Sequence, residues 1–118
     1  MKHVPQKVTW PQKFANAFRG LAVGVRGQNS FWVHLPAGLA VLGLGLAWGL
    51  DTIRFGLLLL CIAAVISSEF FNSALEILAR VITDEHDERI RDALDIASGA
   101  VLTVSLFAVA IAVLVFLF

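Results

Sequence analysis

Acidic side chains are missing from the first 50 residues of the chain, and all nine aspartates and glutamates lie from Asp51 onward. Nine lysines and arginines balance them, so the formal net charge is zero although the two signs are unevenly placed. This uneven placement carries information on topology. The early basic residues are Lys2, Lys7, Lys13, Arg19 and Arg26.

Cysteine is almost absent, and the one cysteine, Cys61, lies within a run of leucine and isoleucine. A single cysteine excludes a disulfide framework within the chain, and the redox compartment cannot be read from it. Most isolated cysteines in apolar surroundings act as small hydrophobic residues, so we expect no reactive role for Cys61.

Long apolar runs, in contrast, are abundant. Hydrophobic residues make up 58% of the 118 residues, which is more than a soluble domain of this length could bury. Lipid is therefore the expected solvent for most of the surface. The basic start is not expected to be a cleaved signal peptide, because the first long apolar run begins only near Phe31.

Three segments are long enough to cross a bilayer, which takes about 20 mostly apolar residues. They are residues 31–50, 55–79 and 96–118. The second is long enough only if it includes Glu69, Asn72 and Glu76, so these polar residues belong to the span. We therefore predict an all-α membrane protein with a single domain, residues 1–118, and three transmembrane helices.

Lysine and arginine counts predict the orientation of these spans. The connection 51–54 is short and makes the first two spans an antiparallel hairpin. Five basic residues precede the first span, Arg54 lies in the hairpin turn, and three arginines separate the second span from the third. The excess of positive charge faces the cytoplasm in such proteins, so we expect a multi-pass protein with a cytoplasmic N-terminus.

Residues 10–27 predict a fourth, amphipathic helix. Pro11 suits a first helical turn, and apolar residues recur at helical spacing opposite Lys13 and Arg19. Such a helix is expected to lie on the membrane surface, with a soluble partner as the alternative binding surface. Three glycines of the first span are interpreted as sites of close helix packing rather than as a nucleotide loop; they are Gly43, Gly45 and Gly49.

The polar residues of the second span share one face. At 100° per residue, Asn72 lies about 60° and Glu76 about 20° from Glu69 around the helix axis. Glu69 lies about 10 Å deeper in the membrane than Glu76. An ionisable side chain inside lipid costs a few kcal/mol or more and is a functional candidate by default.

The two depths suggest two roles. Glu69 lies at the level of the lipid glycerol groups and is a candidate general base. Glu76 reaches the aqueous rim, where a carboxylate can hold Mg²⁺ that also binds phosphate oxygens. Other polar residues expected near this rim each have a simpler interpretation, as a solvated connector, a charge at a helix N-terminus or an interfacial hydrogen-bonding group. They are Gln28, His34, Glu85, His86, Asp87, Asp95 and Ser98.

At Glu69-x-x-Asn72-Ser73-Ala74-x-Glu76 the sequence resembles the small prokaryotic integral-membrane lipid kinases, the diacylglycerol kinase and undecaprenol kinase family. The similarity extends over nearly the whole chain. It includes Phe14, Ala17, Arg19 and Gly20 in the expected surface helix, and Asp95, Ser98, Ala100 and Val101 in the third span.

The resemblance implies a homotrimer in the bacterial inner membrane that transfers the γ-phosphoryl of MgATP to a lipid hydroxyl, without a nucleic-acid partner. It implies Glu69 as the catalytic base, which also contacts the lipid, and Glu76 as a metal ligand. The remaining roles implied by the family are metal binding by Gln28, nucleotide binding by Asn72, Glu76, Glu85, His86 and Asp95, and lipid binding by Ser98.

Two positions depart from the family pattern. Gln28 replaces a metal-binding glutamate, and Leu94 replaces a lysine beside Asp95. Arg91, one turn before Leu94, is expected to supply the missing cation for the nucleotide, and Arg80 is a second candidate.

The substrate stays open between diacylglycerol and undecaprenol. The segments 82–86 and 99–101, together with His34, look more like the undecaprenol kinase branch. An alternative function is a kinase-fold protein that lost ATP chemistry through Gln28 and Leu94 and serves as a lipid-binding or assembly subunit. A proton or ion pathway built on Glu69 and Glu76 lacks a continuous polar stripe, because residues 55–66 carry no charged or amide side chain.

Overall fold

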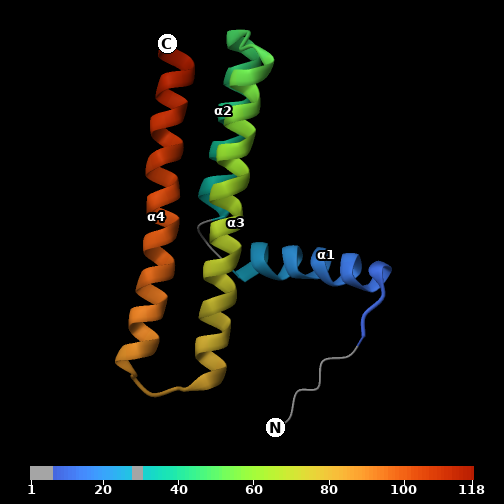
Figure 1. The fold of residues 1–118 in the computed structure, drawn as a ribbon, viewed down its shortest axis with the longest axis vertical. Helices are drawn as coiled ribbons and strands as arrows, with labels where there is room; N and C mark the ends of the chain where they lie inside the picture. The colour runs from blue at the N-terminus through green and yellow to red at the C-terminus, as the bar shows by residue number, and fades with distance from the viewer. Residues whose placement is uncertain (1–6, 28–30) are drawn as a thin grey trace.

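A computed structural model describes residues 7–27 and 31–118 of the chain. It contains four helices, α1 (Trp10–Gly27), α2 (Phe31–Trp48), α3 (Thr52–Ile82) and α4 (Glu88–Leu117). Helices α2, α3 and α4 run along the long axis, and α1 projects from the side of α3 (Figure 1). Helix α3 packs against each of the other three helices. The predicted all-helical fold is confirmed for the described residues.

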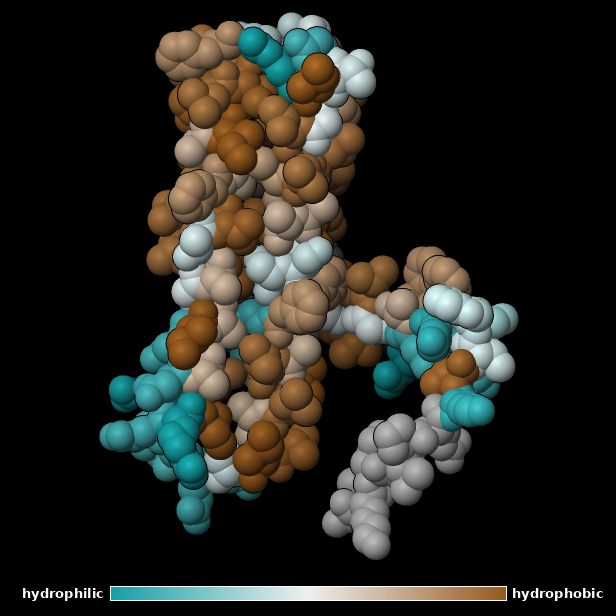
Figure 2. Space-filling view, in the orientation of Figure 1, coloured by the Kyte–Doolittle hydropathy of each residue, from teal (hydrophilic) through white to brown (hydrophobic). Residues whose placement is uncertain are grey.

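Three of these helices, α2, α3 and α4, are long and apolar enough to cross a membrane. Among the described residues, the buried apolar side chains are only Phe31, Leu58 and Val115. Most leucines, isoleucines and valines are exposed instead, and the space-filling view shows them over the upper part of the bundle (Figure 2). An apolar surface of this extent requires lipid as its solvent, as the composition predicts.

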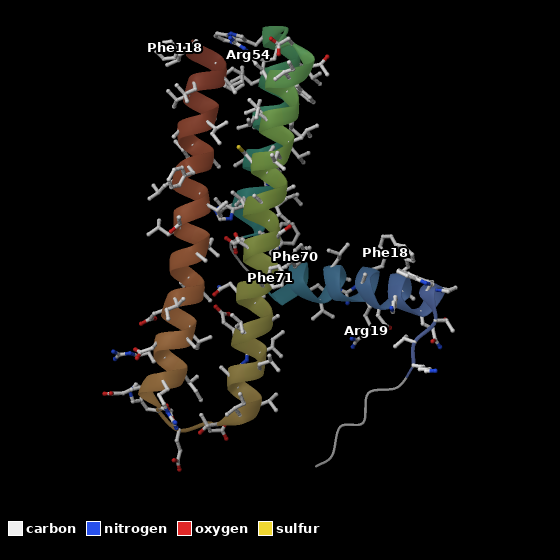
Figure 3. The ribbon with its side chains drawn as sticks, in the orientation of Figure 1. Phe18, Arg19, Arg54, Phe70, Phe71 and Phe118 are labelled. Atoms are coloured by element: carbon white, nitrogen blue, oxygen red, sulfur yellow. The ribbon has the colours of Figure 1, made fainter. Side chains whose placement is uncertain are left out.

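Helix α1 begins with a capping box. The Thr9 backbone N–H donates to Gln12 Oε1 (3.0 Å), and the Gln12 backbone N–H donates to Thr9 Oγ1 (3.4 Å). These bonds satisfy backbone donors of the first turn, and Pro11 fits there because it has no N–H to satisfy. The side chains of Phe18 and Arg19 extend from α1 in different directions, with Phe18 toward the Arg54 end of the bundle and Arg19 toward the loop end (Figure 3).

Helix α2 ends at a glycine. Gly49 has a φ of 72°, the left-handed conformation that glycine adopts without steric cost. Its N–H donates to Leu46 O and the Leu50 N–H donates to Gly45 O, both at 3.2 Å, which together form a Schellman motif. The prediction of close packing at three glycines is correct only for Gly45, which lies against Leu50 and Phe55. Gly43 faces open space and Gly49 is a helix cap.

Arg54 connects the α2–α3 turn to the far end of α4. Its guanidinium donates to Val115 O (3.1 Å) and Phe118 O (2.8 Å). Arg54 and Phe118 lie close together at the upper end of the bundle in Figure 3. These carbonyls lie at the helix C-terminus, where cations are favoured. Asp51 caps α3 by accepting from the Arg54 backbone N–H at 2.8 Å. The turn and the end of α4 are therefore fixed to each other.

Helix α4 begins earlier than the predicted third span. It starts at Glu88, about two turns ahead of Ile96, because Asp87 caps it by accepting from the Arg89 backbone N–H at 2.8 Å. Asp95 therefore lies inside the helix, and its interpretation as a charge at a helix N-terminus is wrong. The loop 83–87 joins α3 to α4 beyond the apolar surface, where polar side chains gather (Figures 1 and 2).

Candidate active site

Glu69 is the most unusual side chain of α3, because it is ionisable and only 4% exposed. Ser73 is the other buried polar residue in the described chain, and its Oγ donates to the Glu69 carbonyl oxygen at 3.0 Å. His34 of α2 faces Glu69, with Nδ1 2.8 Å from Oε1. The carboxylate is therefore enclosed between α2 and α3 rather than directed into lipid.

Aromatic packing next to Glu69 joins three helices. The Phe31 ring of α2 lies against the Phe70 ring of α3, with 4.6 Å between centroids. Gly24 of α1 is buried against the same Phe70 ring, and a Cβ at Gly24 would collide with it. Figure 3 shows Phe70 and Phe71 where α1 meets α3. These contacts fix the ends of α1 and α2 at the level of Glu69.

Asn72 and Glu76 follow Glu69 along the same face of α3. The Asn72 Nδ2 donates to Glu76 Oε1 at 3.1 Å, and both side chains are half-buried. Asn72 Oδ1 is buried and has no hydrogen-bond partner among residues 7–27 and 31–118. The structure therefore places a buried amide oxygen next to a carboxylate, and oxygens of these two kinds are ligands that Mg²⁺ accepts.

A pocket of about 370 Å³ opens beside Glu76 at the loop end of the bundle. Glu85 of the loop and Arg80 of α3 also line it, so two carboxylates and a guanidinium surround one space. This combination suits a cation together with a phosphate group. Leu94 lines the same pocket and contributes only apolar surface.

The other predicted site residues lie outside this pocket. Arg91 and Asp95 pair across one turn of α4 at 4.0 Å, with side chains 62% and 73% exposed. His86 is exposed in the loop and Ser98 is exposed on α4. Gln28 falls outside the described residues. Of the two expected replacements for the missing lysine, Arg80 lines the pocket and Arg91 does not.

An apolar groove of about 230 Å³ begins at His34 and continues between α2, α3 and α4 toward Ala112. Its lining is aliphatic apart from His34, Cys61 and Ser105. His34 therefore has two neighbours of opposite character, the Glu69 carboxylate and a groove that suits hydrocarbon.

Asp87 is a group outside the predicted spans whose pKa is lowered by its neighbours. The Arg89 side chain, and then its backbone N–H, donate hydrogen bonds that lower the pKa of the Asp87 carboxyl. The same pairing raises the pKa of Arg89. Asp87 therefore caps α4 as a carboxylate at neutral pH.

The described residues contain no group of three histidine, cysteine or acidic side chains positioned as a closed metal site. Mg²⁺ does not require one, since it binds through one or two carboxylates together with water and substrate phosphates. Glu76, the Asn72 amide oxygen and Glu85 suit such an open site.

The fold and site together define a membrane protein with three spanning helices, a buried carboxylate and a polar pocket on one end of the same helix. A model of the prokaryotic diacylglycerol kinase family matches residues 15–116, so the chain belongs to this family of lipid kinases. The chain is also 33% identical over 106 residues to an undecaprenol kinase of Bacillus subtilis (strain 168). The aligned region covers 90% of this chain and 86% of that protein.

Sequence reasoning missed the contact between His34 and Glu69. The two residues are far apart in the sequence and lie on different helices, so helical spacing cannot bring them together. One available signal was that His34 is the single titratable residue of the first span.

Proposed function

We propose that this protein transfers the γ-phosphoryl group of ATP to the hydroxyl of undecaprenol, with Mg²⁺ as cofactor. The observation that carries the proposal is the placement of two carboxylates on one face of α3. Glu69 is buried at the junction of three helices, and Glu76 borders an open polar pocket about 10 Å along the helix. A lipid hydroxyl can therefore approach Glu69 from the bilayer, while a nucleotide can approach Glu76 from water.

The choice of undecaprenol is supported by the similarity to an undecaprenol kinase, which extends over 90% of this chain. The segments 82–86 and 99–101 and the presence of His34 agree with this choice. Diacylglycerol is the competing acceptor, because acyl and prenyl chains present the same apolar surface to a groove.

The protein is proposed to lie in the bacterial inner membrane, with its N-terminus, α1 and the loop 83–87 on the cytoplasmic side. Helix α2, which begins near the α1 junction, is about 27 Å long, close to the hydrocarbon thickness of about 30 Å. The side chains of Phe18 and Arg19 extend from α1 toward different ends of the bundle, which suits a helix that lies in the membrane surface (Figure 3).

Each residue then has a defined task. Glu69 accepts the proton of the lipid hydroxyl while that oxygen forms a bond to the γ-phosphorus and the bond to the ADP oxygen breaks. Bound Mg²⁺ would neutralise developing charge on the phosphate oxygens. Glu76 and the Asn72 amide oxygen would hold it, with Glu85 and Gln28 as further ligands. Arg80 would contact phosphate in place of the missing lysine.

The remaining roles follow the family resemblance. His86, Asp95 and Arg91 are proposed to contact nucleotide and Ser98 the lipid. Because these four side chains lie away from the Glu76 pocket within one chain, a second protomer is the proposed route by which they reach it. The proposed assembly is a homotrimer, which native mass spectrometry of the micellar protein would identify by its mass.

The test is transfer of labelled phosphate from ATP to undecaprenol or diacylglycerol in mixed micelles with Mg²⁺. We expect product with undecaprenol, at least a 100-fold loss in Glu69→Gln, and little change in Glu88→Gln, an exposed glutamate of α4. Transfer to diacylglycerol alone would correct the substrate. Absence of transfer to either lipid by intact oligomers would favour the lipid-binding or assembly function.

A further inference from the structure

We propose that His34 is a positioning residue for Glu69, an inference that rests on the proposed function. In this arrangement the imidazole Nδ1–H donates to the Glu69 carboxylate and holds it in the orientation that accepts the lipid proton. His34 itself does not contact the reacting phosphate and takes no proton in the step.

The contact geometry is the first support. Nδ1 lies 2.8 Å from Oε1, within the usual range for an N–H donor and a carboxylate. The Glu69 side chain is 5% exposed and that of His34 is 33% exposed, so the contact is largely shielded from solvent. Nδ1 is buried and lacks a well-aligned hydrogen-bond acceptor among the described residues. Such misalignment before substrate binds is common in active sites, where bonds tighten in the reactive complex.

The surroundings of Glu69 are the second support. The Asn72 amide nitrogen already donates to Glu76, one turn away. Ser73 donates to the Glu69 main-chain oxygen rather than to its carboxylate. Arg19 and Arg26 of α1 are exposed, and Arg80 lines the pocket at Glu76. His34 is thus an ionisable side chain that contacts the Glu69 carboxylate directly.

The groove supplies the third support. His34 lines the apolar groove between α2, α3 and α4 while it contacts Glu69. A hydrocarbon chain in that groove would shield the imidazole and the carboxylate from water. An N–H donor to a carboxylate becomes stronger as the local dielectric falls, so the pair would be most rigid when lipid is bound.

A positioning role predicts a specific kinetic pattern. We expect His34→Leu to lower kcat by about 10- to 100-fold, as misplacement of a reacting group by about 1 Å can do, with the KM for ATP unchanged. His34→Asn should recover most of this loss, because its amide nitrogen can occupy the place of Nδ1. Val33→Ala, an exposed neighbour on α2, is the control for general effects of substitution.

A second measurement does not depend on activity. The chain has three histidines, so ¹⁵N-histidine spectra of the micellar protein contain few resonances to assign. We expect the Nδ1 resonance of His34 to be that of a protonated nitrogen and to shift in Glu69→Gln, while the resonances of His3 and His86 stay in place. An unprotonated Nδ1, or one that ignores Glu69→Gln, would overturn the proposal even if the protein proved not to be a kinase.

The two proposals fail in different ways. An inactive wild-type protein contradicts the kinase function, and the spectra then still decide the contact. An active wild-type protein in which His34→Leu keeps the wild-type kcat contradicts the positioning role alone. A loss of kcat that His34→Asn does not recover would also overturn the role of an Nδ1 donor.

Discussion

At the scale of single residues, the site depends on where α3 places its carboxylates. Glu69 is enclosed by neighbouring helices, whereas Glu76 borders an open pocket that it shares with Arg80 and Glu85. A carboxylate in an open pocket can exchange water for a cation, and an enclosed one is suited to a proton. Glu69 and Glu76 carry the same chemical group, and the difference in their surroundings suits them to different roles.

Replacement of Glu76 by glutamine should weaken metal binding while it leaves the base in place. We expect Glu76→Gln to raise the Mg²⁺ concentration for half-maximal rate at least 10-fold, because one charged oxygen ligand is lost. Initial rates across a Mg²⁺ titration measure this, with Glu88→Gln as the matched control. An unchanged Mg²⁺ requirement would remove Glu76 from the set of ligands.

The cap of α4 should depend on pH. Because hydrogen bonds lower the pKa of Asp87, its stabilising contribution is present above the pKa of an unfolded aspartate and is lost as pH falls through the lowered value. The Arg89 amide resonance should report this change with a midpoint below that of an aspartate in a model peptide. Asp87→Asn should abolish the titration, and a midpoint at or above the ordinary value would contradict the assignment.

The residues of the α3 face were predictable because one helix carries them all. A helical period fixes the angles between Glu69, Asn72 and Glu76 once the span is recognised. The partner of Glu69 was not predictable, since hydropathy locates a span but gives no rotation of one helix against another. The sequence allows either Arg80 or Arg91 to replace the missing lysine, and only the structure shows that Arg80 lines the pocket.

At the scale of helices, the three spans were predictable from long apolar runs, while their ends were not. Hydropathy marks where apolar residues begin, and α4 begins about two turns earlier, at the Asp87 cap. Asp87 is a residue type that often caps helices, but nearby residues in the sequence are also acidic, so its role as a cap could not be distinguished from theirs. The start of α4 matters because it places Arg91 and Asp95 on a rigid helix.

The junction of α1 with α3 can be tested with two glycines of one helix. Alanine favours a helix over glycine by about 1 kcal/mol, so Gly20→Ala, which faces open space, should stabilise the protein. Gly24→Ala should lose that gain or reverse it, because its Cβ would collide with the Phe70 ring. Thermal unfolding in micelles measures both variants. Equal stabilisation by both would show that α1 is not docked at this point.

At the scale of the whole molecule, the distribution of charge divides the protein into two ends. The loop 83–87 and the start of α4 are polar, whereas the bundle above them is mostly apolar up to a small polar patch at its upper end (Figure 2). The Glu76 pocket lies at the end that carries the loop 83–87, so the proposed nucleotide would reach it from the side of the membrane that the loop faces.

The orientation can be measured with single cysteines in a Cys61→Ala background. We expect a membrane-impermeant maleimide to label Thr52→Cys on intact spheroplasts, because the α2–α3 turn should face outward. Asp84→Cys should react only in inside-out vesicles, as the positive residues near α1 and the loop favour the cytoplasm. Labelling of Asp84→Cys on intact spheroplasts would invert the topology.

In the proposed orientation Arg54 lies at the outer boundary of the bilayer, and its bonds to the carbonyl oxygens of Val115 and Phe118 join this end of α3 to the end of α4. Glu69 then lies about 22 Å further along an unbroken helix. In that orientation α3 would set the distance of Glu69 from the outer leaflet, so the depth of Glu69 below the inner leaflet would vary with membrane thickness. In vesicles of increasing acyl length, the rate of phosphoryl transfer should be highest at one membrane thickness. A rate that does not change with thickness would show that α3 is not held at a fixed depth.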